Sequence, residues 1–242
     1  MQLLNAEEME MIGVRLKELK KDLPRITYPE YVEMVKGVSP DKPYLVNIRG
    51  ANGTGKSTIP LLMTITDPDT VLVVNENGKE ILTYCPAFEM TLMGRYYTKT
   101  GGLDISLFQD KYYIKEILTN VWHDTKTNIL MEGIVVSSSY GFYADMFKAF
   151  VETDQHRTDG CQREVLIMNL KMDLDDLEKR IMARNGGKPI KMHYVKGKQD
   201  TVMRNVPKFK RDKFNSWVTT NRDVLYSDML NWFDKEISSH LS

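Results

Sequence analysis

The stretch Gly50-Ala51-Asn52-Gly53-Thr54-Gly55-Lys56-Ser57 decides the fold of this chain. It fits the pattern G-x-x-x-x-G-K-[ST], in which glycines let backbone N–H groups surround a polyphosphate. In this pattern the lysine reaches the β- and γ-phosphates, and the next hydroxyl holds Mg²⁺. The sequence therefore predicts a phosphate-binding loop rather than an ordinary glycine-rich turn. The residues expected to contact a nucleotide are Gly50, Asn52, Gly53, Thr54, Gly55, Lys56, Ser57 and Thr58.

The flanks of the loop agree with this prediction. Residues 43–49 are a β-rich apolar run, which predicts a strand, and residues 57–63 can open a helix. Pro60 falls in the first turn of that helix, where a missing N–H is tolerated. A strand before the loop and a helix after it are the context that a nucleotide-binding loop requires.

In the rest of the chain, segments with a strand pattern alternate with segments with a helix pattern. Residues 70–74, 128–133 and 164–170 read as buried strands, and Asn77-Gly78 suits a tight hairpin to a returning strand over 79–85. Helical spacing covers residues 107–122, 142–150, 173–184 and 223–240. Alternation of this kind predicts an α/β domain over residues 41–242: a three-layer α/β/α P-loop NTPase fold with a mainly parallel sheet.

The first forty residues precede the first expected core strand. Met9, Ile12, Leu16 and Leu19 form one apolar stripe on a helix over residues 6–22, and a second short helix is expected over 28–38. We therefore expect residues 1–40 to be a helical appendage packed on the domain. The alternative is a helix that binds a partner or forms a dimer.

Composition narrows the class of protein. Hydrophobic residues make up 42% and charged residues 27% of the 242 residues, as in ordinary globular proteins. The net charge is zero, so any surface for nucleic acid has to be local. Cys85 and Cys161 predict neither a disulfide framework nor a metal cluster. A reducing compartment, the lack of a transmembrane-length run and the lack of a signal peptide indicate a cytoplasmic protein.

Three carboxylates are candidates for catalysis. Glu132 closes the apolar strand 128–133, and parallel sheets present such residues to a ligand. There it can hold a Mg²⁺-bound water or accept a proton from an attacking hydroxyl, unless it faces solvent. Asp104 and Glu76 are the other two candidates, and spacing alone does not rank the three.

The segment 93–104 is rich in glycine, aromatic and charged residues, a composition typical of functional loops. Glycines there allow close approach of the backbone to a substrate. Arg95 can clamp a phosphate, while Tyr96 and Tyr97 can stack on a base. The expected substrate site comprises Arg95, Tyr96, Gly101, Gly102 and Asp104.

A basic region follows. Arg180 and Arg184 lie four apart on one helix face, and from Arg180 to Lys213 there are eleven Lys or Arg but only two acids, Asp200 and Asp212. Residues 185–206 are Gly/Lys-rich and poorly periodic, so we expect a mobile basic lid over about 184–206 that closes on phosphates and excludes water. The alternatives are a track for a nucleic-acid backbone and a solvated charged face.

The order of these motifs resembles the P-loop kinases of the nucleoside and nucleotide kinase fold. Residues 47–58, the pair of motifs Gly94-Arg95-Tyr96 and Gly101-Gly102-Leu103-Asp104, and residues 130–137 are similar to motifs of bacteriophage 5-hydroxymethyluracil DNA kinases. Those enzymes phosphorylate the base hydroxymethyl group within DNA before the base is hypermodified. The similarity covers roughly residues 43–184.

The resemblance implies a reaction and its participants. ATP and Mg²⁺ would bind through Lys56 and Ser57, with Glu132 as a further metal-site residue. Arg180 and Arg184 would be lid arginines, and Glu132 or Asp104 would orient or deprotonate the acceptor hydroxyl. The acceptor would be a modified pyrimidine in DNA, in the host cytoplasm for a phage enzyme.

Two other functions stay open at this stage. One is a kinase for a free nucleoside or nucleotide. The chain lacks the Asp-Arg-Tyr or Glu-Arg-Ser patterns seen in thymidylate and deoxynucleoside kinases, which disfavours it. The other is a DNA-binding module that hydrolyses ATP without a small acceptor.

Overall fold

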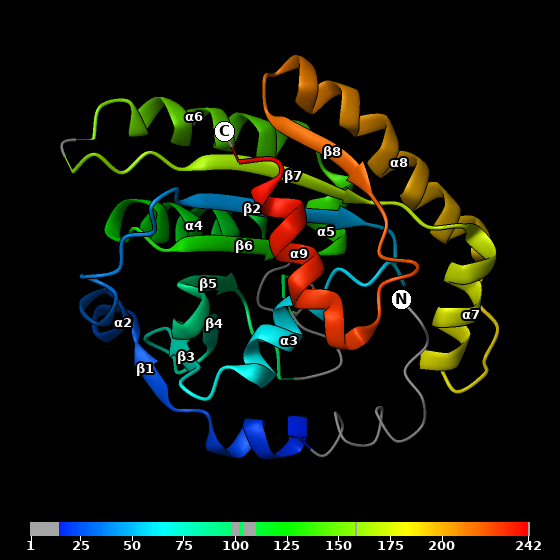
Figure 1. The fold of residues 1–242 in the computed structure, drawn as a ribbon, viewed down its shortest axis with the longest axis horizontal. Helices are drawn as coiled ribbons and strands as arrows, with labels where there is room; N and C mark the ends of the chain where they lie inside the picture. The colour runs from blue at the N-terminus through cyan, green and yellow to red at the C-terminus, as the bar shows by residue number, and fades with distance from the viewer. Residues whose placement is uncertain (1–14, 98–101, 104–109, 158, 242) are drawn as a thin grey trace.

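The computed structural model describes residues 15–97, 102–103, 110–157 and 159–241. They form an eight-stranded sheet in the order β1-β3-β4-β5-β6-β2-β7-β8 (Figure 1). Among the paired strands, β4 runs antiparallel to both neighbours, and the other pairs are parallel. The strands are β1 (Arg25–Thr27), β2 (Tyr44–Gly50), β3 (Val71–Val74), β4 (Glu80–Cys85), β5 (Met90–Met93), β6 (Asn128–Glu132), β7 (Glu164–Leu170) and β8 (Asn215–Thr219).

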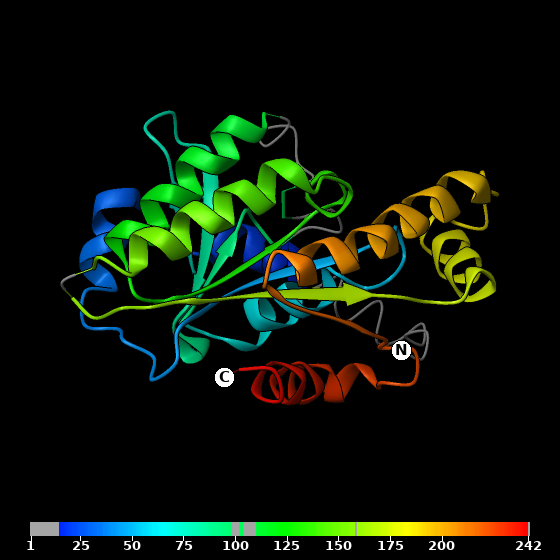
Figure 2. The same ribbon diagram turned by 90° about the horizontal axis from the view of Figure 1, so that it is seen from above.

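Helices cover both faces of the sheet. Figure 2 shows α4 and α6 on one face and α9 on the other, where it packs with α3. The helices are 15–22, α2 (Tyr28–Met34), α3 (Thr58–Thr66), α4 (Lys111–Asp124), α5 (Ile134–Ser138), α6 (Gly141–Asp154), α7 (Leu174–Arg184), α8 (Met192–Arg211) and α9 (Met229–Ser238), with 3-10 turns at Pro86–Phe88 and Tyr226–Asp228. The predicted mainly parallel α/β/α architecture is confirmed.

The alternation of side chains along β2 builds two separate cores. Leu45 points to the face of α4 and α6, where it joins Phe147 in one apolar cluster. Val46 and Ile48 point to the opposite face and join Ile59 of α3 in another. Because β2 is buried on both faces, its sequence is a nearly continuous apolar run, as is typical of a central parallel strand.

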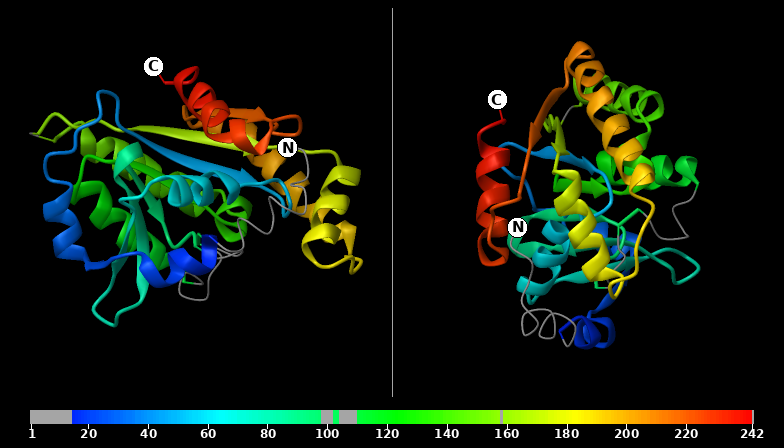
Figure 3. Two further views of the ribbon diagram at one scale, coloured as in Figure 1. Left: turned by 60° about the horizontal axis from the view of Figure 1, so that its bottom comes forward. Right: turned by 90° about the vertical axis from the view of Figure 1, so that its right-hand side faces the viewer.

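The sheet has two ends with different roles. We call the end at which β2, β6 and β7 finish the carboxyl edge, and the end at which β2, β7 and β8 begin the amino edge. The loop after β2 lies at the carboxyl edge. In Figure 3, α7 and the nearby part of α8 lie beyond the carboxyl edge.

The N-terminal segment is more integrated than the sequence predicts. β1 pairs with β3 as an edge strand, and Tyr31 of α2 is buried with its hydroxyl 2.6 Å from Thr91 Oγ1. The short helix expected over 28–38 forms as α2, but the prediction of a purely helical appendage is wrong at residues 25–27, which form a strand of the sheet. A three-residue strand is too short to leave a periodic signal.

The apolar stripe of the first helix packs on the domain itself. Leu16 and Leu19 are buried in a cluster with Leu72 and Tyr97. In the described residues the helix covers its own sheet, as expected, and the alternative of a partner-binding helix has no support there. Met9 and Ile12 lie outside the described residues.

The largest difference concerns the predicted mobile lid. Residues 192–211 form the 20-residue helix α8, which buries Val195, Val202 and Phe209 at intervals of seven residues. Lysines between these positions, together with Gly197 and Pro207, hide the apolar period in the sequence. The prediction that this region lacks periodic structure is therefore wrong. Strands β5 and β8 and the short helix α5 were also not predicted.

None of the helices within the described ranges is both long enough and apolar enough to cross a membrane.

Candidate functional site

The glycine-rich loop connects the end of β2 to the start of α3 at the carboxyl edge. Gly53 and Gly55 have φ angles of 85° and 88°, in the left-handed region that favours glycine. A Cβ on Gly53 would lie 2.9 Å from Ile181 of α7, and one on Gly55 would lie 2.8 Å from Asn221 Nδ2. The loop is thus packed from two sides, and side chains at these glycines would force it apart.

Polar groups inside the loop converge on its own backbone. Thr54 Oγ1 donates to the Ala51 carbonyl at 2.9 Å, and Lys56 Nζ donates to the same carbonyl at 3.2 Å. The backbone N–H of Gly50 donates to Ser137 Oγ of α5 at 3.3 Å. The loop therefore has the strand–loop–helix context and the inward lysine that phosphate binding requires.

Glu132 faces this loop from the end of the neighbouring strand. β6 pairs with β2 so that Glu132 lies beside Ile48, and the carboxylate is fully buried. Ser57 Oγ donates to Glu132 Oε1 at 3.0 Å. A hydroxyl and a carboxylate are oxygen ligands of the kind that Mg²⁺ prefers, so Ser57 and Glu132 fit a site for this ion.

The backbone of Gly102 and Leu103 lies against this carboxylate. Gly102 has a φ of 65°, and a Cβ there would overlap Glu132 Oε1. The N–H of Leu103 donates to the Glu132 carbonyl at 3.2 Å, and Arg95 pairs with Gly102 in an isolated bridge. The structure thus places Gly102, one of the expected substrate-site residues, against Glu132.

Of the other expected substrate-site residues, Tyr96 also reaches this point, since a Cβ on Gly102 would lie 2.7 Å from its hydroxyl. Arg95 pairs with Glu80 at 3.0 Å. Tyr96 is 1% exposed and Tyr97 is 4% exposed. Their rings complete apolar clusters, so the expected stacking of a base on either tyrosine is wrong for this structure. Gly101 and Asp104 lie outside the described residues.

The third candidate carboxylate is not at the loop. Glu76 is exposed in the turn between β3 and β4, and three strands separate β3 from β2 in the sheet. β3 runs parallel to β2, so Glu76 follows the carboxyl end of its strand as expected, but the intervening strands hold it away from the loop.

Helix α7 lies along the loop through the contact of Ile181 with Gly53. Arg180, the residue before Ile181, is half-buried, and burial lowers the pKa of its guanidinium while the nearby Asp176 opposes that shift. Arg184 is exposed in the last turn. The helix forms as expected, with Arg180 near the loop and Arg184 on the surface.

The sequence analysis did not identify two buried residues that lie beside the glycine-rich loop. Asn221, which follows β8, is 1% exposed and lies against Gly55. Arg49 is fully buried directly before the loop, and its Nη2 donates to the Ser137 and Ser139 carbonyls at 2.6 and 3.0 Å. A charged residue inside an apolar strand is a signal that could have found Arg49. Asn221 carried no such signal because β8 itself was not recognised.

The guanidinium of Arg49 has an unusual environment. It stacks over the Phe209 ring at 4.7 Å, and burial lowers the pKa of Arg49 to about 9. It therefore stays charged at neutral pH. By holding two carbonyls of the segment after Glu132, Arg49 fixes α5 against β2.

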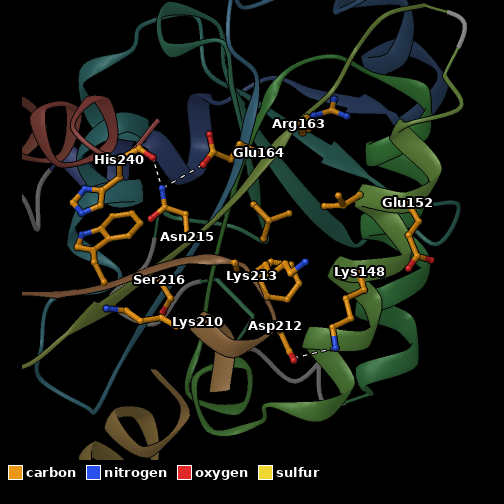
Figure 4. A pocket seen from close by; sticks show the side chains of 14 residues that line it. Lys148, Glu152, Arg163, Glu164, Lys210, Asp212, Lys213, Asn215, Ser216 and His240 are labelled. Carbon is orange, nitrogen blue, oxygen red and sulfur yellow. Dashed lines mark hydrogen bonds and ion pairs between the residues drawn. The ribbon is translucent and has the colours of Figure 1, made fainter. Parts of the chain in front are cut away.

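A cavity of about 810 Å³ lies at the other end of the sheet (Figure 4). It opens between α6, the end of α8 and the starts of β7 and β8, and Lys148 pairs there with Asp212 at 3.1 Å. The cavity is at the amino edge, whereas the glycine-rich loop is at the carboxyl edge. The length of the strands therefore separates the two.

Known proteins resemble this chain over most of its length. The family model described as "5-hmdU DNA kinase" matches residues 28–220. A "5-hmdU DNA kinase" of Bacillus phage SP10 is 36% identical over 199 residues, which cover 81% of this chain and 30% of the relative. The "5-hmdU DNA kinase 1" of Salmonella phage ViI is 28% identical over 154 residues, 63% of this chain and 64% of the relative.

A third relative has a similar size. The "5-hmdU DNA kinase" of Pseudomonas phage M6 is 31% identical over 194 residues, covering 76% of this chain and 92% of the relative. The chain thus spans 30% and 64% of the SP10 and ViI relatives. A solved chain from the PezAT toxin–antitoxin system of Streptococcus pneumoniae aligns at 11% identity with a TM-score of 0.42, a likeness too weak to argue from.

Proposed function

The chain belongs to the 5-hmdU DNA kinase family, and we propose that it transfers the γ-phosphate of ATP to the hydroxymethyl group of 5-hydroxymethyluracil in DNA. One observation supports this reaction above all. The hydroxyl of Ser57, the last residue of the loop, contacts the buried carboxylate of Glu132 at 3.0 Å. A phosphate-binding loop and a strand-end carboxylate therefore meet at one point, as phosphoryl transfer requires.

The loop would bind the triphosphate through its N–H groups. Lys56 would leave the Ala51 carbonyl and turn to the β- and γ-phosphates, where its charge stabilises the phosphoryl group in transit. Ser57 and Glu132 would hold Mg²⁺, which neutralises charge on the β- and γ-phosphates when bound. The glycines at 53 and 55 would allow the backbone to approach these phosphates closely.

The acceptor hydroxyl needs a group that orients it and takes its proton. Glu132 is the candidate at the described part of the site, and Asp104 is the second candidate for this role. As the acceptor oxygen bonds to phosphorus, the bond from phosphorus to the ADP oxygen breaks, and the hydroxyl proton passes to the carboxylate. The glycine at 102 lets the backbone lie directly against Glu132, where a side chain would displace the carboxylate.

The burial of Glu132 has a consequence for the DNA. A base that stays stacked in a duplex cannot reach a carboxylate that is fully buried at the end of a strand. We therefore infer that the target nucleotide leaves the stack, which costs a few kcal/mol in a duplex. Arg180 and Arg184 of α7 would lie over the phosphates and help to exclude water.

The proposal can be tested by mass spectrometry. Oligonucleotides that carry either one 5-hydroxymethyluracil or thymine at the same position are incubated with the protein, Mg²⁺ and ATP, and digested to nucleotides without phosphatase. We expect one added phosphate on the modified nucleotide and none on thymidine. The variant Lys56→Ala should give no product.

Two outcomes would overturn the proposal. If the free nucleoside of 5-hydroxymethyluracil accepts phosphate and the oligonucleotide does not, the protein is a small-molecule kinase. If DNA stimulates ATP hydrolysis without any phosphorylated nucleotide, it is an ATP-hydrolysing DNA-binding module. Salt separates the first alternative further, because the KM for DNA should rise steeply with ionic strength.

A further inference from the structure

Lysines from neighbouring helices meet aromatic rings around the connection between α5 and α6. This segment, residues 138–142 with the adjoining helix ends, follows the site directly, since α5 begins two residues after Glu132. We call the surface the Lys–aromatic strip. Its members are Lys198, Lys208 and Lys111 and the rings of Tyr140, Phe142 and Tyr112.

The lysines come from two other helices. Lys198 of α8 donates to Ser138 Oγ at 3.1 Å, and Lys208 of α8 places its Nζ 5.2 Å from the centre of the Tyr140 ring. Lys111 of α4 lies 4.9 Å from the centre of the Phe142 ring. Three separate lysines therefore converge on one short connecting segment.

The outermost ring is held in place without being buried. Tyr112 is 65% exposed, yet it meets Phe142 edge to face with ring centres 5.6 Å apart. Its N–H donates to Asp110, the N-terminal cap of α4. A fixed aromatic face that the fold leaves open is a platform on which a planar ligand can stack.

The strip lies at the same edge of the sheet as the loop. α4 and α6 each connect two parallel strands, so both helices start at the carboxyl edge (Figure 2). Gly102 and Leu103, which touch Glu132, precede α4 in the chain, while Glu132 itself precedes α5 and α6. The strip thus starts beside the site, and at Tyr140 it reaches Asp212, which lines the cavity at the amino edge.

Acidic and basic side chains both surround the strip, so its net charge alone does not favour DNA. What favours DNA is the position of the lysines beside the aromatic rings. Asp212 is engaged by the Tyr140 hydroxyl and by Lys148 at 3.1 Å. Asp110 caps α4, and Glu116 and Asp145 also lie on α4 and α6. Proteins that bind single-stranded nucleic acid combine stacking rings with cations that follow the phosphates. Paired bases in a duplex would hide the faces that such rings need.

We propose that the Lys–aromatic strip binds the single-stranded DNA that flanks the target nucleotide. Bases stack on Tyr112 and Phe142, and phosphates lie at Lys111, Lys198 and Lys208. This inference rests on the proposed function, since it names the surface that presents DNA to the same site. The strip takes the base-stacking role that the sequence assigned to Tyr96 and Tyr97, whose buried rings cannot stack on a base.

The test compares Tyr112→Leu, which loses the aromatic face, with Tyr112→Phe, which keeps it. Binding of a fluorescent single-stranded 5-hydroxymethyluracil oligonucleotide is measured by anisotropy, and kcat and KM are measured with the same oligonucleotide. We expect Tyr112→Leu to raise Kd and KM roughly five- to 150-fold with kcat unchanged, as for the loss of one stacked base. Tyr112→Phe should have the Kd, KM and kcat of the wild type. Both variants should have the melting temperature of the wild type.

A second pair tests the phosphate contacts. Lys111→Gln should reduce the slope of log Kd against log salt by about 0.7, the value for one phosphate on a single strand. Lys36→Gln, a change of an exposed lysine just after α2, should leave the slope unchanged. Wild-type protein should bind the single strand more tightly than the matching duplex.

The strip and the proposed function fail in different ways. If the wild type phosphorylates the oligonucleotide while Tyr112→Leu keeps the wild-type Kd and KM, the proposal for the strip is wrong and the proposed kinase activity is supported. If the wild type transfers no phosphate, the proposed function fails, and the anisotropy measurement still decides the strip. Equal Kd values for all four variants and the wild type would overturn the proposal that the Lys–aromatic strip binds DNA.

Discussion

The two ends of the same sheet use similar residues for different purposes. At the amino edge, polar groups hold elements together: Arg163 donates to the Trp122, Thr125 and Thr127 carbonyls, and Asn215 donates to Glu164. At the carboxyl edge, Ser57 and Glu132 meet beside a loop whose glycines keep side chains out. The difference shows that similar charged residues hold elements together at one edge and meet a glycine-rich loop at the other.

The comparison is useful because each residue type occurs at both edges. Glu132 has a counterpart in Glu164, Gly102 in Gly160, and Arg49 in Arg163. Matched substitutions can therefore separate effects on catalysis from effects on stability.

The largest expected effect is that of Glu132→Gln. The substitution keeps the shape but removes the charge that orients the hydroxyl or the metal, so kcat should fall by about 10²–10⁴-fold. Glu164→Gln removes a carboxylate at the amino edge and should leave kcat near the wild-type value. Steady-state kinetics with the 5-hydroxymethyluracil oligonucleotide measure both, and equal losses in the two variants would contradict the assignment.

The next comparison concerns two glycines with similar backbone angles. Gly102 and Gly160 have φ angles of 65° and 72°, but a Cβ would overlap Glu132 at Gly102 and would meet nothing within 4 Å at Gly160. Both alanine variants carry the same backbone strain, of about 1 kcal/mol. Gly102→Ala alone should displace the carboxylate and lower kcat/KM by roughly 10²-fold. Activity of Gly102→Ala equal to that of Gly160→Ala would show that close approach at Glu132 is unimportant.

The two buried arginines should separate stability from activity. Arg163→Met leaves the Thr125 and Thr127 carbonyls without their donor, while the Trp122 carbonyl still accepts from Arg157. Arg49→Met also leaves two carbonyls without their donor, at about 1–3 kcal/mol for each buried group. Urea unfolding should therefore show a similar loss of stability in both variants. Only Arg49→Met should lower the activity per folded molecule, by about tenfold, because it releases α5 beside the loop. A purely structural Arg49 would leave the activity per folded molecule unchanged.

The smallest effect concerns pH. Glu80 is desolvated, but hydrogen bonds from Tyr97, Arg95 and Arg25 outweigh that and lower its pKa, and the Arg157 contact lowers the pKa of Asp159 at the amino edge. Because both folded-state pKa values are depressed, the stability they contribute is present above the unfolded pKa and lost as pH falls through the folded one. Glu80→Gln should therefore lower Tm by about 2–4 °C at pH 7, with the difference vanishing in acid.

Asp159→Asn provides the control for Glu80→Gln. Its stability loss should have the same pH dependence and be smaller, because Asp159 is more exposed. Glu80 also anchors Arg95, which pairs with Gly102 beside Glu132, so only Glu80→Gln should reduce kcat at pH 7. Scanning calorimetry and kinetics across pH values check both expectations.

Local patterns predicted the centre of the fold well. The glycine spacing of residues 50–57 and the apolar runs around it are determined by neighbouring residues, so the strand, loop and helix form where expected. Glu132 was placed at a strand end because parallel strands present their ends to ligands. These features need no knowledge of distant contacts.

Features that depend on distant contacts were not predictable. β1 and β8 are short and are defined by pairing with β3 and β7, and α8 is defined by an apolar face hidden among lysines. Tyr96 and Tyr97 have the composition of a binding loop, yet packing buries them. Asn221 reaches the loop only through the fold, since 166 residues separate it from Gly55.

The most direct test of the central claim is the amount of phosphate transferred per 5-hydroxymethyluracil in a single-stranded oligonucleotide. Wild-type protein and Lys148→Ala, a change at the amino edge, should both reach one phosphate per modified base. Lys56→Ala should fall at least about 10²-fold below them in rate, because it lacks the cation that stabilises the phosphoryl group. Transfer by Lys56→Ala at the wild-type rate, or none by the wild type, would contradict the account.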